Sequence, residues 1–94
     1  MTTTAAHAET VALQVLAWLA ADEEFLGVFL GASGTSAEDL RARADDPDFL
    51  AAVLDFVLLD DAWVMACCDA CGLAYDAPAA ARQWLPGGAA VHWT

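Results

Sequence analysis

The sequence contains no lysine, no asparagine and no isoleucine, and its only strongly basic residues are Arg41, Arg43 and Arg82. A surface that binds the phosphate backbone of a nucleic acid needs clustered lysine and arginine, so the composition excludes that class of function. The absence of lysine also excludes a Walker-type phosphate site. The three missing amino acids share A/T-rich codons, and we attribute their absence to genome composition.

Acidic residues far outnumber basic ones, with 14 Asp and Glu and a formal net charge of −11 at pH 7. Such a charge keeps a protein soluble and would attract a basic protein partner. A solvated acidic surface without a partner explains the same charge, so both interpretations stay open.

Long apolar segments are missing as well. Gln14, Asp55 and the pair Asp60 and Asp61 interrupt the longest apolar runs. These runs fall short of the ~18–20 residues that a membrane-spanning helix requires. The first residues carry no basic region ahead of an apolar one, so we expect no secretory signal, no membrane association and a cytoplasmic protein.

The length bounds the architecture, because 94 residues form one domain with one modest core. We expect a single helical domain over residues 1–94, with a disordered start at residues 1–4, a helical core at residues 5–86 and a flexible tail at residues 87–94. The hydrophobic fraction is high, at 60 %, but much of it is alanine, which favours helices more than it fills cores.

Residues 46–72 contain two predicted helices, which we expect to form the core of the domain. Asp46 is a suitable N-cap, and Pro47 suits the first helical position, where its missing N–H costs nothing. Apolar residues then recur at helical spacing: Phe49, Leu50, Val53, Leu54 and Val57. If this helix continued, Asp60 or Asp61 would enter the apolar stripe, which is costly for an unpaired charge. We therefore predict a break there, with one aspartate capping a second helix.

The second helix of this segment contains Trp63, Val64 and three cysteines, and Gly72 suits a left-handed C-cap that ends it. Only Asp69 gives this helix a polar side. We therefore expect it to be buried nearly all round, with Trp63 in the core.

Four other patterns predict the remaining helices. The first runs from a cap near Thr4 to about residue 21, and the second runs from residue 22 to a stop at Gly31, followed by a loop that contains Ser33. Ser36 opens a short helix over residues 37–44, and a last helix covers residues 77–85. The pattern predicts an all-α, compact single domain of five or six short helices that cross as an irregular orthogonal bundle.

The segment Leu-Arg-Ala-Arg-Ala-Asp-Asp-Pro-Asp-Phe-Leu-Ala-Ala-Val-Leu-Asp-Phe-Val-Leu at residues 40–58 is followed by Asp60, Asp61 and a helix closed by Gly72. Together with Trp-Leu-Ala-Ala-Asp-Glu-Glu at residues 18–24, it resembles a small bacterial family catalogued as a domain of unknown function. The resemblance covers most of residues 9–87 and implies a helical fold, but no activity and no site residues.

Three cysteines, Cys67, Cys68 and Cys71, form the sharpest motif. Redox Cys-x-x-Cys pairs usually lie at a helix N-terminus, where the dipole lowers the thiol pKa, whereas these lie at the other end of the predicted helix. A zinc site needs about four ligands, which would require His7 and His92 from the two ends of the chain. Free cysteine is commonly buried. We interpret the cysteines as core residues, with a thiol-based redox or metal-responsive sensor as the alternative.

Other polar motifs predict structure rather than chemistry. Ser33 lacks the glycine spacing of a nucleophile elbow, and residues 45–48 lack the glycine and glutamate of a calcium loop. We therefore expect no catalytic residue, no metal site and no cofactor. The favoured function is a non-catalytic protein-interaction or regulatory module, a monomer or weak homodimer, with aromatics that short helices do not fully cover.

The charge predicts a salt dependence. Several acids have no base within one helical turn in the sequence: Asp22, Glu23, Glu24, Asp48, Asp55, Asp60 and Asp61. Repulsion between these carboxylates destabilises the folded protein. At about 0.1–0.15 M salt the Debye length is ~8–10 Å, so moderate salt already screens this repulsion. We expect the melting temperature, followed by circular dichroism, to rise between about 10 mM and about 150 mM salt. A constant melting temperature would show that the acids are better compensated than the sequence indicates.

Overall fold

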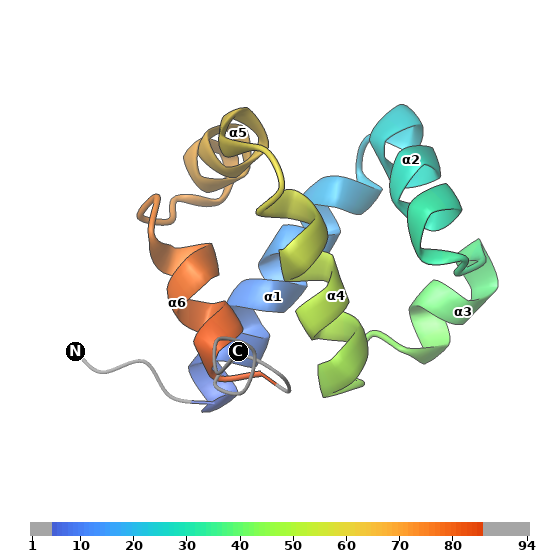
Figure 1. The fold of residues 1–94 in the computed structure, drawn as a ribbon, viewed down its shortest axis with the longest axis horizontal. Helices are drawn as coiled ribbons and strands as arrows, with labels where there is room; N and C mark the ends of the chain where they lie inside the picture. The colour runs from blue at the N-terminus through green and yellow to red at the C-terminus, as the bar shows by residue number, and fades with distance from the viewer. Residues whose placement is uncertain (1–4, 86–94) are drawn as a thin grey trace, which may run out of the picture.

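The structure is a computed structural model that describes residues 5–85 (Figure 1). These residues form six α-helices and contain no strand, which confirms the all-α fold. The helices are α1 (Ala5–Ala20), α2 (Glu23–Ser33), α3 (Ala37–Ala42), α4 (Pro47–Val57), α5 (Asp61–Cys71) and α6 (Ala77–Gln83). The expected disordered start, flexible tail and cap at Thr4 lie outside the described residues.

Aspartate side chains begin three of the helices. Asp22, Asp46 and Asp60 each accept a hydrogen bond from the backbone N–H two residues later, at 3.0, 3.0 and 2.8 Å. Ser36 caps α3 by accepting from the backbone N–H three residues later, at 3.1 Å. Each bond satisfies a donor that the first helical turn leaves without a partner. The predicted break between α4 and α5 is therefore confirmed.

The predicted end of α2 is wrong. The helix continues through Gly31 to Ser33 and ends at Gly34, whose φ is 72° and whose N–H donates to the carbonyl of Leu30 at 2.9 Å. A glycine inside a helix costs only ~1 kcal/mol, and Gly34 supplies the left-handed cap three residues later. Ser33 is accordingly the last helical residue rather than a loop residue, and its hydroxyl accepts from the N–H of Thr35 at 3.3 Å.

Helices α1 and α4 form the centre of the core. The residues predicted to form an apolar stripe on α4 are buried: Phe49, Leu50, Val53, Leu54 and Val57. α1 buries Val11, Val15, Leu16 and Leu19, which also recur at helical spacing. α1 packs most extensively against α6 and α4, and it also contacts α5 and α2. α4 adds contacts to α5 and α6, so the two central helices connect most of the domain (Figure 1).

Helix α5 is less buried than predicted. Only Val64, Cys67 and Cys68 are buried, while Met65 is exposed and Trp63 is half-buried. α5 lies at the edge of the domain and meets α1 and α4 along one side (Figure 1). Its exposed residues are Asp61, Ala62, Met65, Ala66, Asp69 and Ala70, so carboxylates and small side chains make up most of the face that meets water.

A cluster of six aromatic rings joins α2 to α1, α4 and α5. The rings belong to Trp18, Phe25, Phe29, Phe49, Phe56 and Trp63. Phe25 lies at its centre, with ring centroids 5.0 Å from Trp18, 5.6 Å from Phe56 and 4.9 Å from Trp63. Trp18, near the end of α1, therefore packs against α2. Edge-to-face pairs such as Trp18–Phe25 stabilise by about 0.5–1.5 kcal/mol beyond burial alone.

Arg43 shows how local pairing differs from the sequence pattern. Its spacing favours an ion pair with Asp39 one turn earlier, but its Nε lies 3.8 Å from a carboxylate oxygen of Asp46. The guanidinium carbon also lies 5.0 Å from the ring centroid of Phe49. The cause is that α3 ends at Ala42, so Arg43 turns toward the start of α4.

A core substitution tests this packing. Leu54 is fully buried, and Leu54→Ala is expected to lower the free energy of unfolding by ~2–5 kcal/mol through lost burial and the remaining cavity. Leu59→Ala is the matched control, because Leu59 is 78 % exposed and its truncation should cost less than about 0.5 kcal/mol. Urea unfolding measures both. A loss below ~1 kcal/mol for Leu54→Ala would contradict the assignment of the α4 face.

Candidate functional site

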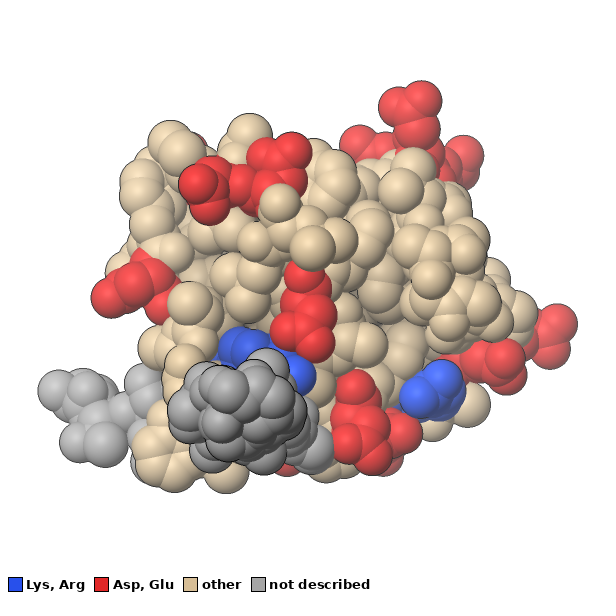
Figure 2. All heavy atoms as spheres, in the orientation of Figure 1, with Lys and Arg blue, Asp and Glu red and all other residues tan. Residues whose placement is uncertain are grey.

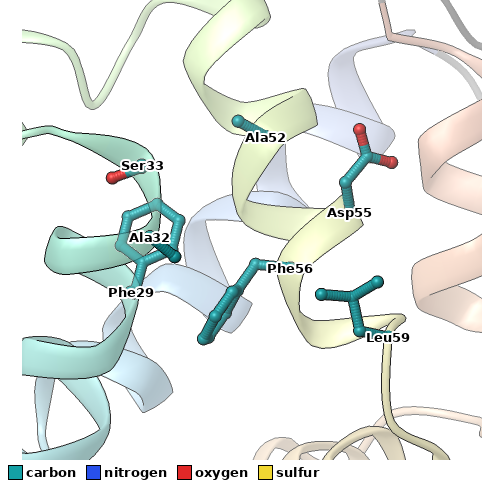
Figure 3. Close-up of a pocket in the computed structure, with 7 residues that line it drawn as sticks. All are labelled: Phe29, Ala32, Ser33, Ala52, Asp55, Phe56 and Leu59. Carbon is teal, nitrogen blue, oxygen red and sulfur yellow. The ribbon is translucent and has the colours of Figure 1, made fainter.

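An open groove of about 310 Å³ lies between α2 and α4 (Figure 3). It is lined by Phe29, Ala32 and Ser33 from α2, by Ala52, Asp55 and Phe56 from α4, and by Leu59 from the turn that follows α4. The volume is at the small end of the range for ligand pockets and corresponds to one or two side chains of a partner.

Two buried aromatic rings form the floor of the groove. Phe29 is 1 % exposed and Phe56 is 8 % exposed, and their ring centroids lie 5.1 Å apart in an edge-to-face arrangement. In Figure 3 the two side chains point toward one another across the space between the helices. The flanking residues Ala32 and Ala52 are too short to fill the space above the rings. The hollow therefore follows from large residues below and small residues above.

Leu59 forms an apolar edge of the groove. Its side chain is 78 % exposed, the largest exposure among the described large apolar side chains. The residue stands in a tight turn, where its backbone N–H donates to the carbonyl of Phe56 at 3.2 Å. A single exposed leucine is ordinary on a protein surface, but this one continues an apolar groove.

Asp55 forms a polar edge of the groove and is paired with Arg82 of α6. Arg82 Nε donates to Asp55 Oδ1 at 2.7 Å and Nη2 donates to Oδ2 at 3.2 Å, so the contact is bidentate. Arg82 Nη1 also donates to the carbonyl of Leu85 at 3.5 Å. The side chain of Arg82 is 16 % exposed and that of Asp55 is 57 % exposed. The pair joins α6 to the outer face of α4 and fixes the orientation of a solvent-facing carboxylate.

No sequence pattern indicates this pair, because Asp55 has no base within a helical turn and Arg82 follows 27 residues later. The groove was missed as well, since its residues come from two helices and only the fold brings them together. Ser33, considered only as a nucleophile, lies at the groove edge on α2. No local signal indicates any of these placements.

The three cysteines lie on α5, away from the groove. Cys67 and Cys68 are buried in the core, and Cys71 is half-buried with its Sγ donating to the carbonyl of Gln14 at 3.7 Å. Burial, with a smaller contribution from nearby Cys71, raises the pKa of Cys67 to about 12. Burial also raises the pKa of Cys68. The thiols of Cys67 and Cys68 therefore stay protonated at neutral pH, which disfavours a thiolate-based sensor.

A metal-responsive site built on the cysteines would need His7 and His92 as further ligands. His7 is on the exposed face of α1, and His92 lies outside the described residues. Over residues 5–85, no group of three or more His, Cys, Asp and Glu side chains is placed to hold a metal ion. No helix among those described is long and apolar enough to span a membrane.

Acidic side chains surround the face that carries the groove. Figure 2 shows red carboxylate atoms near the start of α2, along α4 and beside α3, around a tan area over α2 and α4. Blue atoms appear on this face in two places, beside α6 and beside α3. The groove is therefore an apolar surface within an acidic surrounding.

A family model described as "Protein of unknown function (DUF3572)" matches residues 5–88. This match confirms the resemblance to a family of unknown function, and it includes all six helices described above. No curated protein and no solved structure matches the chain.

The cysteines predict a pH dependence. The pKa of Cys67 is about 12 in the folded protein, against an ordinary value of 9.0. Between these values the unfolded chain loses the thiol proton and the folded protein keeps it, so the free energy of unfolding falls as pH rises. Urea unfolding at several pH values above about 9 measures this decrease in the free energy of unfolding. The decrease with pH should be smaller in Cys67→Ala, because that variant lacks the thiol.

Thiol titration gives an independent test. At about pH 8, a thiol-specific reagent should leave Cys67 and Cys68 of the native protein unlabelled, whereas all three cysteines should react in urea. Fast labelling of Cys67 in the native protein would contradict the buried, protonated state and support the sensor.

Proposed function

The chain belongs to the DUF3572 family of proteins of unknown function, and on that premise we propose that it is a non-catalytic protein-interaction module. The groove between α2 and α4 receives apolar side chains of the partner. One observation carries the proposal: an apolar hollow, open to water, combines a floor of two buried rings with the 78 % exposed side chain of Leu59.

The energetics of such a groove favour protein binding. Covering an exposed leucine side chain contributes about 1.5–3 kcal/mol through burial of apolar surface. The floor is already ordered, because Phe29 and Phe56 are locked in the aromatic cluster, so binding does not have to immobilise them. Binding energy in protein interfaces concentrates in small, well-packed spots of this kind.

The polar groups at the groove support a non-catalytic function. Ser33 and Asp55 come from different helices and point away from one another in Figure 3. The Ser33 hydroxyl accepts a backbone hydrogen bond, and the Asp55 carboxylate is bound by Arg82. Nucleophilic or acid–base catalysis requires a nucleophile and a base within hydrogen-bond reach. These contacts give Ser33 and Asp55 structural tasks.

A selection experiment tests the proposal. A library of displayed helical peptides is selected on the native protein, and the enriched peptides are titrated against Ala52→Trp, in which the new side chain fills the groove. We expect at least ~10-fold weaker binding, which equals ~1.4 kcal/mol. Leu59→Ser should weaken the same peptides, because it removes the apolar edge.

The matched control is Ala66→Trp, which adds the same side chain at an exposed position of α5. It should bind the enriched peptides as the native protein does, and circular dichroism should show that both tryptophan variants are folded. Failure to enrich any peptide, or equal binding to Ala52→Trp and the native protein, would contradict an interaction function for the groove.

A further inference from the structure

We infer that the segment received by the groove is a basic amphipathic helix whose apolar face covers Leu59 and the floor and whose lysine or arginine binds Asp55. This inference rests on the proposed function, since it specifies the partner of the same groove. It is supported by the shape of the groove, by the orientation and exposure of the Asp55 carboxylate, and by the net charge of the chain.

The outer face of α4 alternates acidic and apolar residues. Asp48, Ala52, Asp55 and Leu59 are spaced by four, three and four residues, so they form one stripe along the helix and the turn after it. All four are exposed. A partner that follows this stripe meets a carboxylate, a small apolar residue, a second carboxylate and then a leucine.

The stripe matches the length and period of a helix. Ala52, Asp55 and Leu59 line the groove over about two helical turns, roughly 10 Å. A helix presents anchors at i, i+3 or i+4, and i+7 over the same distance, which is the usual spacing in helix-in-groove recognition. Residues 5–85 contain no sheet edge to which an extended peptide could add a strand.

The Asp55 carboxylate is arranged to accept a second cation. Arg82 uses one position on each oxygen, at 2.7 and 3.2 Å, and holds the group in place. A carboxylate has about four acceptor positions, and the Asp55 side chain remains 57 % exposed. The positions that face solvent are therefore oriented in advance for a partner's lysine or arginine.

Charge decides against a second copy of this chain as the occupant. Two copies would each bring a net charge of −11 to the contact. The chain has three arginines in all, and Arg43 and Arg82 already lie against Asp46 and Asp55 of their own chain. A basic partner, by contrast, gains from the whole acidic surrounding of the groove (Figure 2).

The experiment uses the peptides selected on the native protein. We expect the groove-dependent peptides, meaning those that Ala52→Trp weakens, to carry more Lys and Arg than Asp and Glu. Their affinity should fall about 5–10-fold for Asp55→Asn. It should also fall several-fold between about 50 mM and about 300 mM salt, because salt screens the attraction. Asp76→Asn is the matched control, since it removes the same charge at the start of α6 and should leave the affinity unchanged.

A second variant guards against a structural effect of losing the Arg82 partner. Asp48→Asn lies on the same stripe and leaves the Asp55–Arg82 pair intact. It should lower the affinity for the same peptides about 2–3-fold. If circular dichroism shows that Asp55→Asn is not folded, the affinity of Asp48→Asn tests whether the acidic stripe binds the basic peptides.

The outcomes separate the two proposals. Groove-dependent peptides without a basic excess would overturn the basic helix and leave the interaction function standing. Basic peptides that bind the folded Asp55→Asn variant as tightly as the native protein would also overturn the inference. Peptides whose binding ignores Ala52→Trp would remove the groove itself and, with it, both proposals.

Discussion

The rest of the structure depends on the burial of α4 against α1. Val53, Leu54 and Val57 are fully buried, and α5 and α6 pack on the same two central helices. With only 11 residues, α4 must serve two surfaces, because its inner side completes the core and its outer side borders the groove. Phe56 belongs to both, as a buried core ring and as part of the groove floor. Stability and the proposed binding surface are therefore coupled through one short helix.

The parts of the fold that the sequence predicts correctly are those with local causes. The cap at Asp46, and a cap at either Asp60 or Asp61, could be predicted because a cap bond joins residues two or three positions apart, and the structure selects Asp60. The end of α2 could not, since Gly31 and Gly34 both suit a cap and the cost of a helical glycine is small. The exposure of Trp63 depends on which side of α5 meets the body of the domain, and composition alone does not contain that information.

The candidate site has causes that are mostly distant in sequence. Asp55 could be predicted to lie on the polar face of α4, but its partner Arg82 arrives only when α6 packs beside α4. The groove likewise exists because Phe29 and Phe56, from two helices, meet below two alanines. The cysteine spacing suggested chemistry, but burial decides the protonation of Cys67 and Cys68. The family match extends over the whole described fold and describes its function as unknown.

The side-by-side packing of α1 and α6 has a consequence for how the protein is made. Residues 21–76 separate the two helices, so their contact closes a long loop and is slow to form compared with the helices themselves. During synthesis α1 precedes α6, so the part of its apolar side that packs against α6 stays uncovered until residues 77–83 have been synthesised. Until then this apolar surface makes the nascent chain more prone to aggregation than the finished protein.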